Sequence, residues 1–365
     1  LFRSWALFLD TETTGLSGGT GTVPFLVGLG WFEDDTFVVE QLLLEQLGEE
    51  PPLMARVRER YAQASCLVSF NGKAYDAPLL ATRAVLSRIR DWPQRPHVDL
   101  LHLARRSYRR RLDAFRLVEL ERRVLGFERE HDIDGAEVPG AYWSFLRSSR
   151  PSFLVPVIEH NLHDIVALAA LLAELVHGYA RVDARHEPED QVCRALWALR
   201  SNDHDRVEAF ATAVEAGGAP TAEAFAAFMA AATSARRRKD IASERGWLDR
   251  ALERAQTLDE VRRVRLERAK HFEHRAKDLK RALAESEALL GLDPSAATAH
   301  RRSRLWSRVG RAKLDRPAAS ADAHHAEHAR QDHQQQRAAC GPGGGADPVA
   351  VDQRRVGGGV KAPAQ

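Results

Sequence analysis

An apolar run near the start of the chain ends in two acidic residues, within the segment Leu7–Leu16, and this feature constrains the fold most strongly. Side chains two positions apart on a β-strand point to the same face, so a strand here projects Asp10 and Glu12 together. Two carboxylates on one face repel each other unless a cation lies between them, and a divalent metal ion with oxygen ligands is the usual solution. The alternative is a polar strand end that leads into a turn. The segment therefore predicts a strand that ends either in a metal site or in ordinary polar residues.

The 365-residue chain is long enough for two domains, and its formal net charge of +2 is close to neutral. Attraction to nucleic acid must therefore come from local basic patches. The cysteines Cys66, Cys193 and Cys340 lie far apart, which argues against a disulfide framework or a zinc site and favours a cytoplasmic location. No apolar run approaches the roughly 18 residues that a membrane span needs, and no signal-peptide pattern opens the chain. Because the chain begins with Leu1 rather than Met, an upstream segment can be missing from it.

The next segments predict a mixed α/β layer. Strands are expected at Phe25–Phe32, Phe37–Leu44, Cys66–Phe70 and Val98–Leu101, and helices at Pro51–Ala64 and Leu117–Leu125. Consecutive strands, then a helix and another strand, are typical of a sheet with helices packed on it. Turn residues are expected at His131–Gly135 and Val138–Gly140.

A second group of polar residues, Asn71–Asp76, follows the fourth predicted strand. Asp76 precedes a helix with Pro78 in its first turn, so it can cap that helix, and Asn71-Gly72 can form a turn. Alternatively, Asp76 contributes a third carboxylate beside the strand-end pair. The residues alone leave both interpretations open.

A third polar group interrupts a long apolar helix that is predicted at about Pro156–His177, with Gly178 as its stop. Asp164 breaks the apolar pattern, and His160, four residues earlier, shares its face. His163 is one residue away and points about 100° aside. These are either ordinary polar positions of a surface helix or parts of a functional site.

The densest basic cluster of the first half surrounds Tyr108 and comprises Arg105, Arg106, Arg109, Arg110 and Arg111. Such a cluster can contact a phosphate backbone, and the aromatic ring inside it can stack a base. It can equally be the solvated end of a helix.

Together, the three polar groups occur in one order within one domain length. In this respect the sequence resembles the DEDD 3′–5′ exonucleases of the ribonuclease H-like superfamily. Asp10 and Glu12 match the first motif of that family, Asn71 and Asp76 the second, and Asp164 the third. A closer similarity, to the bacterial YprB-type proteins, rests on Ser69–Asp76, His97–Arg106 and Asp132–Gly135. The resemblance covers roughly residues 5–178 and implies a ribonuclease H-like fold, which tetratricopeptide-like helices follow in YprB-type proteins.

Phosphodiester hydrolysis fits these residues chemically. It needs an activated water, charge stabilisation at phosphorus and help for the leaving 3′-oxygen, which two divalent ions roughly 3.5–4 Å apart supply. The predicted ligands of Mg²⁺ or Mn²⁺, which prefer hard oxygen atoms, are Asp10, Glu12, Asp76 and Asp164. His160 is the predicted general base, because imidazole titrates near the working pH. One branch of the family has a tyrosine four residues before the last aspartate and another has a histidine five before; here those positions hold His160 and Glu159.

The resemblance also implies that the terminal nucleotide contacts Thr13, Thr14, Leu16, Asn71 and Tyr75. We therefore predict a metal-dependent 3′–5′ exonuclease that acts on DNA or RNA. The alternative is a catalytically inactive nucleic-acid-binding or scaffold protein that keeps the ribonuclease H-like fold. His160 in place of tyrosine keeps that alternative open. A phosphatase or nucleotide hydrolase that uses the same carboxylates is a third interpretation.

From about Arg185 the chain is rich in Ala, Arg, Glu and Leu, which predicts an all-helical array. Leu266–Pro294 has tetratricopeptide-like spacing, although Glu273 and Ser286 occupy positions where that repeat prefers aromatic residues. Such helices present a concave face to protein partners, or alternatively they cap and stabilise the first domain. We expect an exonuclease domain at residues 1–180, a tetratricopeptide-like domain at 185–312 and a disordered low-complexity tail at 316–365.

Overall fold

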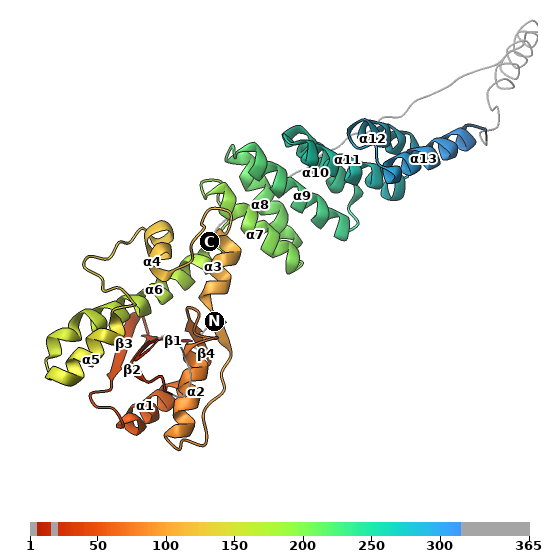
Figure 1. Ribbon diagram of the computed structural model, residues 1–365. Helices are drawn as coiled ribbons and strands as arrows, with labels where there is room; N and C mark the ends of the chain where they lie inside the picture. Colours follow the sequence, from red (N-terminus) through yellow and green to blue (C-terminus); the bar gives the residue numbers. More distant parts are fainter. Residues whose placement is uncertain (1–5, 16–20, 315–365) are drawn as a thin grey trace, which may run out of the picture. The chain divides into compact units, whose positions relative to one another are not determined.

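The computed structural model describes residues 6–15 and 21–314 (Figure 1). The strands are β1 (Ala6–Thr13), β2 (Pro24–Glu33), β3 (Thr36–Leu43), β4 (Cys66–Ser69) and β5 (His97–Asp99). The helices of the first half are α1 (Glu50–Gln63), α2 (Asp76–Leu86), α3 (Leu100–Tyr108), α4 (Leu117–Leu120), α5 (Val138–Ser148) and α6 (Val155–Ala180). Short turns of helix lie at Glu121–Leu125 and Pro151–Phe153. The helices that follow are α7 (Pro188–Arg200), α8 (His204–Ala216), α9 (Thr221–Arg237), α10 (Ile241–Arg254), α11 (Leu258–Lys270), α12 (Leu279–Leu292) and α13 (Ala296–Leu314), with a π-helical turn at His271–Arg275.

The strands form one sheet in the order β3-β2-β1-β4-β5. The hairpin strands β1, β2 and β3 pair antiparallel, whereas β4 runs parallel to both β1 and β5. The sheet is therefore mixed, and the predicted α/β layer is confirmed. Its central strand, β1, is the one that carries Asp10 and Glu12.

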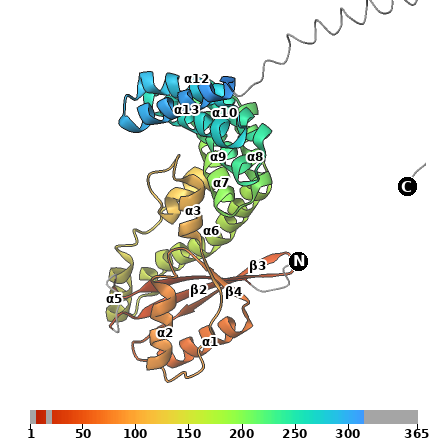
Figure 2. The same ribbon diagram turned by 90° about the vertical axis from the view of Figure 1, so that its right-hand side faces the viewer.

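The two faces of the sheet are covered by different helices. Leu7 and Leu9 of β1 belong to the same buried cluster as Met54 of α1, whereas Phe8 belongs to the cluster that contains Ile165 of α6. Figure 2 shows α1 and α2 on one side of the sheet and α6 on the other. The period-2 alternation of β1 therefore decides which side chains meet α6.

Two glycines of β2 let α6 approach the sheet closely. A side chain on Gly28 would clash with Asn161, and a Cβ on Gly30 would lie 2.6 Å from Cγ2 of Ile165. Real Cβ atoms do not come this close to other atoms. The missing side chains bring the polar turn of α6 within reach of β1.

The helix α6 corrects one expectation. By length and composition the segment Pro151–Ala180 is long and apolar enough to cross a membrane. However, Ile165, Leu168, Leu171 and Leu175 are buried in the cluster that α6 shares with β1 and α3. A core helix satisfies the same length and composition criterion. One third of the apolar window, 33%, is buried here, whereas Leu162, Val166 and Val176 are exposed.

Three predicted boundaries are wrong. The strand expected at Val98–Leu101 ends at Asp99, and Leu100 and Leu101 begin α3. Gly178 does not end the long helix, since α6 continues to Ala180. The glycine is needed at this position for packing, because a side chain on Gly178 would clash with the guanidinium of Arg194. Val138–Gly140 is not a turn but the first turn of α5, with its proline where the helix needs no N–H donor.

The second half is helical, as predicted. Buried residues of α7, α9 and α10, among them Val192, Phe228 and Trp247, share one apolar cluster. The unit Leu266–Pro294 comprises the C-terminal end of α11, the π-helical turn and α12. Its assignment to the tetratricopeptide class stays a prediction, and the predicted disordered tail at 316–365 lies outside the described residues.

Candidate metal centre

The carboxylates of β1 face the helix α6. Asn161 Nδ2 of α6 donates a hydrogen bond to Asp10 Oδ2 over 2.9 Å. Glu12 Oε1 lies 4.0 Å from Nε2 of His160, the residue that precedes Asn161 on α6. The two acidic residues therefore project from one face of β1 toward one turn of α6, as the strand periodicity predicts.

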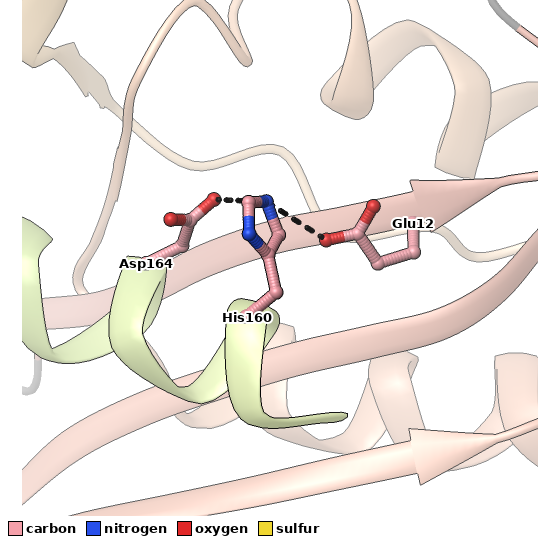
Figure 3. A group of neighbouring side chains, drawn as sticks. All are labelled: Glu12, His160 and Asp164. Carbon is pink, nitrogen blue, oxygen red and sulfur yellow. Dashed lines mark ion pairs between the residues drawn. The ribbon is translucent and has the colours of Figure 1, made fainter. Parts of the chain in front are cut away.

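His160 and Asp164 lie one turn apart on α6, and Asp164 Oδ2 is 3.7 Å from His160 Nε2. Figure 3 shows the imidazole between the carboxylates of Asp164 and Glu12. Within the described part of the chain, these three residues bring ligand atoms within 4.8 Å of one another and so could hold a metal ion. The structure thus joins the start of the chain to the closing helix of its first half.

Asn161 belongs to this site, and the sequence analysis missed it. The side chain is fully buried, and its Oδ1 accepts a hydrogen bond of 3.0 Å from Gln41 Nε2 of β3. Because Gln41 fixes the oxygen end, the Nδ2 end is directed at Asp10. Helical spacing from Asp164, three residues later, was the signal that could have identified it.

Asp76 approaches from the other side of the sheet. It is the first residue of α2 rather than its N-cap, and its Oδ1 accepts a hydrogen bond from the Thr11 hydroxyl. The carboxylate is buried, with 6% of the residue exposed. Asp76 is therefore directed at β1 and not into solvent, which disfavours its interpretation as a simple helix cap.

The negative charges of the acidic residues at this site are not fully neutralised by their neighbours, and the pKa values of three carboxyl groups are raised as a result. Burial, followed by the negative charges of Asp164, Glu12 and Asp76, raises the pKa of Asp10 well above its ordinary value. Burial likewise raises the pKa of Glu12 to about 7, although nearby His160 acts against this, and it raises the pKa of Asp76 to about 6. A divalent cation would relieve this repulsion, so the donor set fits Mg²⁺ or Mn²⁺.

His160 responds to the same field in the opposite direction. Burial disfavours its charged form, but the negative charges of Asp164 and Glu12 and a hydrogen bond to Asp132 outweigh burial and raise the pKa of His160. Asp132 Oδ1 lies 2.7 Å from His160 Nδ1. The imidazole is therefore held at Nδ1 while Nε2 faces the acidic cluster.

Three of the predicted nucleotide-binding residues, Thr13, Thr14 and Tyr75, lie around the end of β1. Tyr75 Oη donates to the Gly15 carbonyl over 3.0 Å, and Thr13 Oγ1 donates to the same oxygen over 2.9 Å. Thr14 Oγ1 accepts from the Val23 amide, and Asn71 adopts a left-handed conformation with φ 63°. These contacts join α2 to the segment after β1. Leu16, the fifth predicted residue, lies outside the described residues.

The basic cluster around Tyr108 has two parts. Arg110 pairs with Glu223 at 2.7 Å and Arg111 with Asp190 at 2.8 Å, so these arginines hold α7 and α9 against the first half of the chain. Tyr108 is buried, which argues against the interpretation in which its ring stacks on a base. The exposed remainder of the cluster is Arg105, Arg106 and Arg109.

Comparison with known proteins agrees with this fold. Residues 7–176 match the family model of the RNase_H superfamily. The chain is also similar to the uncharacterized protein YprB of Bacillus subtilis (strain 168), with 34% identity over 202 residues. That similarity covers 54% of this chain and 49% of YprB, so the chain spans about half the length of the curated relative that it matches.

Proposed function

Because residues 7–176 form a ribonuclease H superfamily domain, we propose that this domain is a metal-dependent nuclease that degrades DNA or RNA from the 3′ end. Domains of this fold generally act on or bind nucleic acid and use divalent metals. The observation that supports the activity most directly is the convergence of Glu12, His160 and Asp164 within 4.8 Å. Asp10 and Asp76 add carboxylates whose charges interact with this group.

The predicted metal ligands are Asp10, Glu12, Asp76 and Asp164. Divalent ions held by these residues would supply activation of the attacking water and stabilisation of charge at phosphorus and at the leaving 3′-oxygen. His160 Nε2 faces the same space as Glu12 and Asp164. In its neutral form it accepts a proton from the attacking water as general base. Asn161 holds the Asp10 carboxylate in orientation through its Nδ2 donor.

Substrate recognition is proposed at two places. Thr13, Thr14 and Tyr75, at the end of β1, and Asn71, whose amide donates to Asp99 of β5, are the proposed contacts of the terminal nucleotide. The exposed Arg105, Arg106 and Arg109 of the basic cluster offer charge for the phosphate backbone.

A degradation assay tests the activity. Single strands of DNA and RNA that carry a 5′ label are incubated with the protein and Mn²⁺ or EDTA, beside Asp10→Asn and the matched control Asp35→Asn. Asp35 is exposed in the turn between β2 and β3 and does not belong to the site. We expect 5′-labelled products that shorten progressively with Mn²⁺ for the wild type and for Asp35→Asn, and intact strands for Asp10→Asn.

Other outcomes identify the alternatives. Intact strands that the protein still binds would support a nucleic-acid-binding or scaffold role, which the departure at His160 keeps open. Consumption of free nucleotides with intact strands would support a nucleotide hydrolase.

For the helical half, from α7 onward, we propose a partner-binding module with tetratricopeptide-like helices. The domain ranges 1–180 and 185–312 and a cytoplasmic location also stay predictions. Limited proteolysis between Arg181 and Glu187, followed by the degradation assay on the N-terminal fragment, would test the first boundary.

A further inference from the structure

The loop between the turn at Glu121–Leu125 and α5 contains a buried arginine. Arg129 has a side chain that is only 2% exposed, although its neighbours Glu128 and Glu130 are exposed. The sequence analysis assigned no role to Arg129, and it predicted only turn residues at His131–Gly135. Burial of a guanidinium in a surface loop is unfavourable unless several acceptors surround it.

Arg129 contacts carboxylates from three directions. Its Nε and Nη2 form a two-pronged pair with Glu121, at 2.7 and 2.6 Å. Its Nη2 also pairs with Asp164 Oδ1, and its Nη1 lies 3.1 Å from Asp132 Oδ2. A bridge to Glu121 alone would satisfy a structural role. The guanidinium instead reaches a carboxylate of the candidate metal centre and a second carboxylate that holds His160.

The contacts of Arg129 leave specific atoms directed at the site. Because Arg129 takes Asp164 Oδ1, the other oxygen, Oδ2, is the one that faces His160 Nε2. The two carboxylate oxygens of Asp132 also have different partners: Oδ2 faces Arg129, and Oδ1 faces His160 Nδ1. His160 Nδ1 has two neighbours, the Asp132 carboxylate at 2.7 Å and Arg129 Nη1 at 3.3 Å. The carboxylate is the nearer one and only accepts hydrogen bonds, which favours a hydrogen on Nδ1 and a lone pair at Nε2 of the neutral ring.

We propose that Arg129 and Asp132 are positioning residues of the nuclease site, which fix Asp164 and the Nδ1–H tautomer of His160 from outside the metal ligands. This inference rests on the proposed function. Partners of this kind orient metal ligands and bases, and their loss typically reduces metal affinity or activity by about 10–100-fold. The loop 126–137 is thus part of the site, although it contributes none of the four predicted ligands.

The test compares Arg129→Lys and Asp132→Asn with the control Arg122→Lys. Lysine keeps the charge but cannot serve three carboxylates with a planar fork. Arg122 is exposed and pairs only with Glu119 among the described residues. Manganese affinity is measured by electron paramagnetic resonance, kcat and KM by strand degradation, and the His160 tautomer by ¹⁵N NMR of histidine-labelled, EDTA-treated protein, with His160→Gln to identify the signal.

We expect Arg129→Lys to weaken Mn²⁺ binding by about 10–100-fold. Asp132→Asn should lower kcat by a similar factor, with KM within about twofold, and shift the ¹⁵N signals of His160 toward the Nε2–H tautomer. Arg122→Lys should match the wild type in all three measurements. If Arg129→Lys loses its cooperative thermal transition, the variant is unfolded, and the kcat and the His160 signal of Asp132→Asn then test the positioning role.

Wild-type values for both site variants would overturn the inference and leave the nuclease proposal intact. A wild-type protein that neither binds Mn²⁺ nor shortens strands would contradict the proposed function itself. The tautomer measurement does not depend on activity, so an unchanged His160 signal in Asp132→Asn would overturn the positioning role in that situation as well.

Discussion

Buried carboxylates have different partners in the helical half of this protein and in the candidate metal centre. In the helical half, Glu244 contacts His271 Nδ1 at 2.8 Å and Arg275 Nε at 2.6 Å. Glu273 pairs with Arg301 at 2.6 Å, and Glu285 has two arginine partners. In the candidate metal centre, Asp10 and Asp76 receive neutral donors, Asn161 and Thr11, whereas Glu50 and Glu121 elsewhere in the sheet domain pair with arginines.

The difference in partners distinguishes carboxylates that stabilise the fold from carboxylates that are available to bind a ligand. A buried carboxylate beside an arginine is compensated by the fold itself, and removal of one partner leaves an unpaired buried charge. The carboxylates of β1 are compensated only in part, which the raised pKa of Glu12, about 7, expresses. The protein folds despite this repulsion, because the burial of the surrounding apolar residues stabilises the domain. Such a site is prepared to bind a cation.

The largest expected effect comes from Asp10→Asn. Strand degradation should fall by more than about 100-fold, since loss of a ligand exceeds loss of a residue that orients one. The EDTA-treated variant should nevertheless melt at a higher temperature than the wild type, because one of the repelling charges is gone. Thermal unfolding with and without Mn²⁺ measures both effects. A lower melting temperature in EDTA would contradict the comparison.

Glu244→Ala should have the opposite profile. It leaves His271 and Arg275 without their shared acceptor, and loss of one partner from a buried ion pair costs about 3–5 kcal/mol. Urea unfolding measures the change. The control Glu253→Ala, at an exposed position of the same helix, should stay within about 0.5 kcal/mol of the wild type. Equal effects of the two variants would show that the buried pair is not structural.

The pH dependence of stability should sharpen the contrast. The pKa of Glu12 rises from 4.5 to about 7 on folding, and that of Asp76 from 3.8 to about 6. Between these values the folded protein binds protons that the unfolded chain has released, so the contribution of these two groups to stability is fully present below about pH 4 and is lost as the pH rises toward 7. Because the pKa of His160 is also raised, its contribution declines in the same direction.

Thermal unfolding in EDTA from pH 4 to pH 8 measures this decline. Glu12→Gln should reduce its slope, because the amide does not titrate. Addition of Mn²⁺ should raise stability most near neutral pH, where the carboxylates are ionised. A Glu12→Gln curve parallel to that of the wild type would argue against charge repulsion at the site.

The smallest expected effect concerns the arginines of α3. Arg105→Ala should weaken binding to single strands modestly and reduce the salt dependence of log K by about one unit if that residue contacts one phosphate. Arg110 pairs with Glu223, so Arg110→Ala should alter stability more than the salt dependence of binding. Fluorescence anisotropy at several salt concentrations separates the two. Identical salt slopes for the two variants would remove the distinction between paired and exposed arginines.

Local patterns predicted much of the fold. Three strands were expected at Phe25–Phe32, Phe37–Leu44 and Cys66–Phe70, and the structure has them within about two residues of those bounds, because alternation and turn residues are local signals. The error at Gly178 had a distant cause. A glycine after an apolar helix is typical of a helix end, but here it accommodates Arg194 of the next helix.

The sequence by itself determined which side chains share a face. Strand alternation places Asp10 with Glu12, and helical spacing places His160 with Asp164, since both periodicities follow from backbone geometry. Only the tertiary structure decided that these pairs meet, that Asn161 orients Asp10 from 151 positions away, and that Arg129 reaches Asp164. Such contacts depend on the close packing of α6 on the glycines of β2 and on the path of one loop, and no local periodicity encodes either.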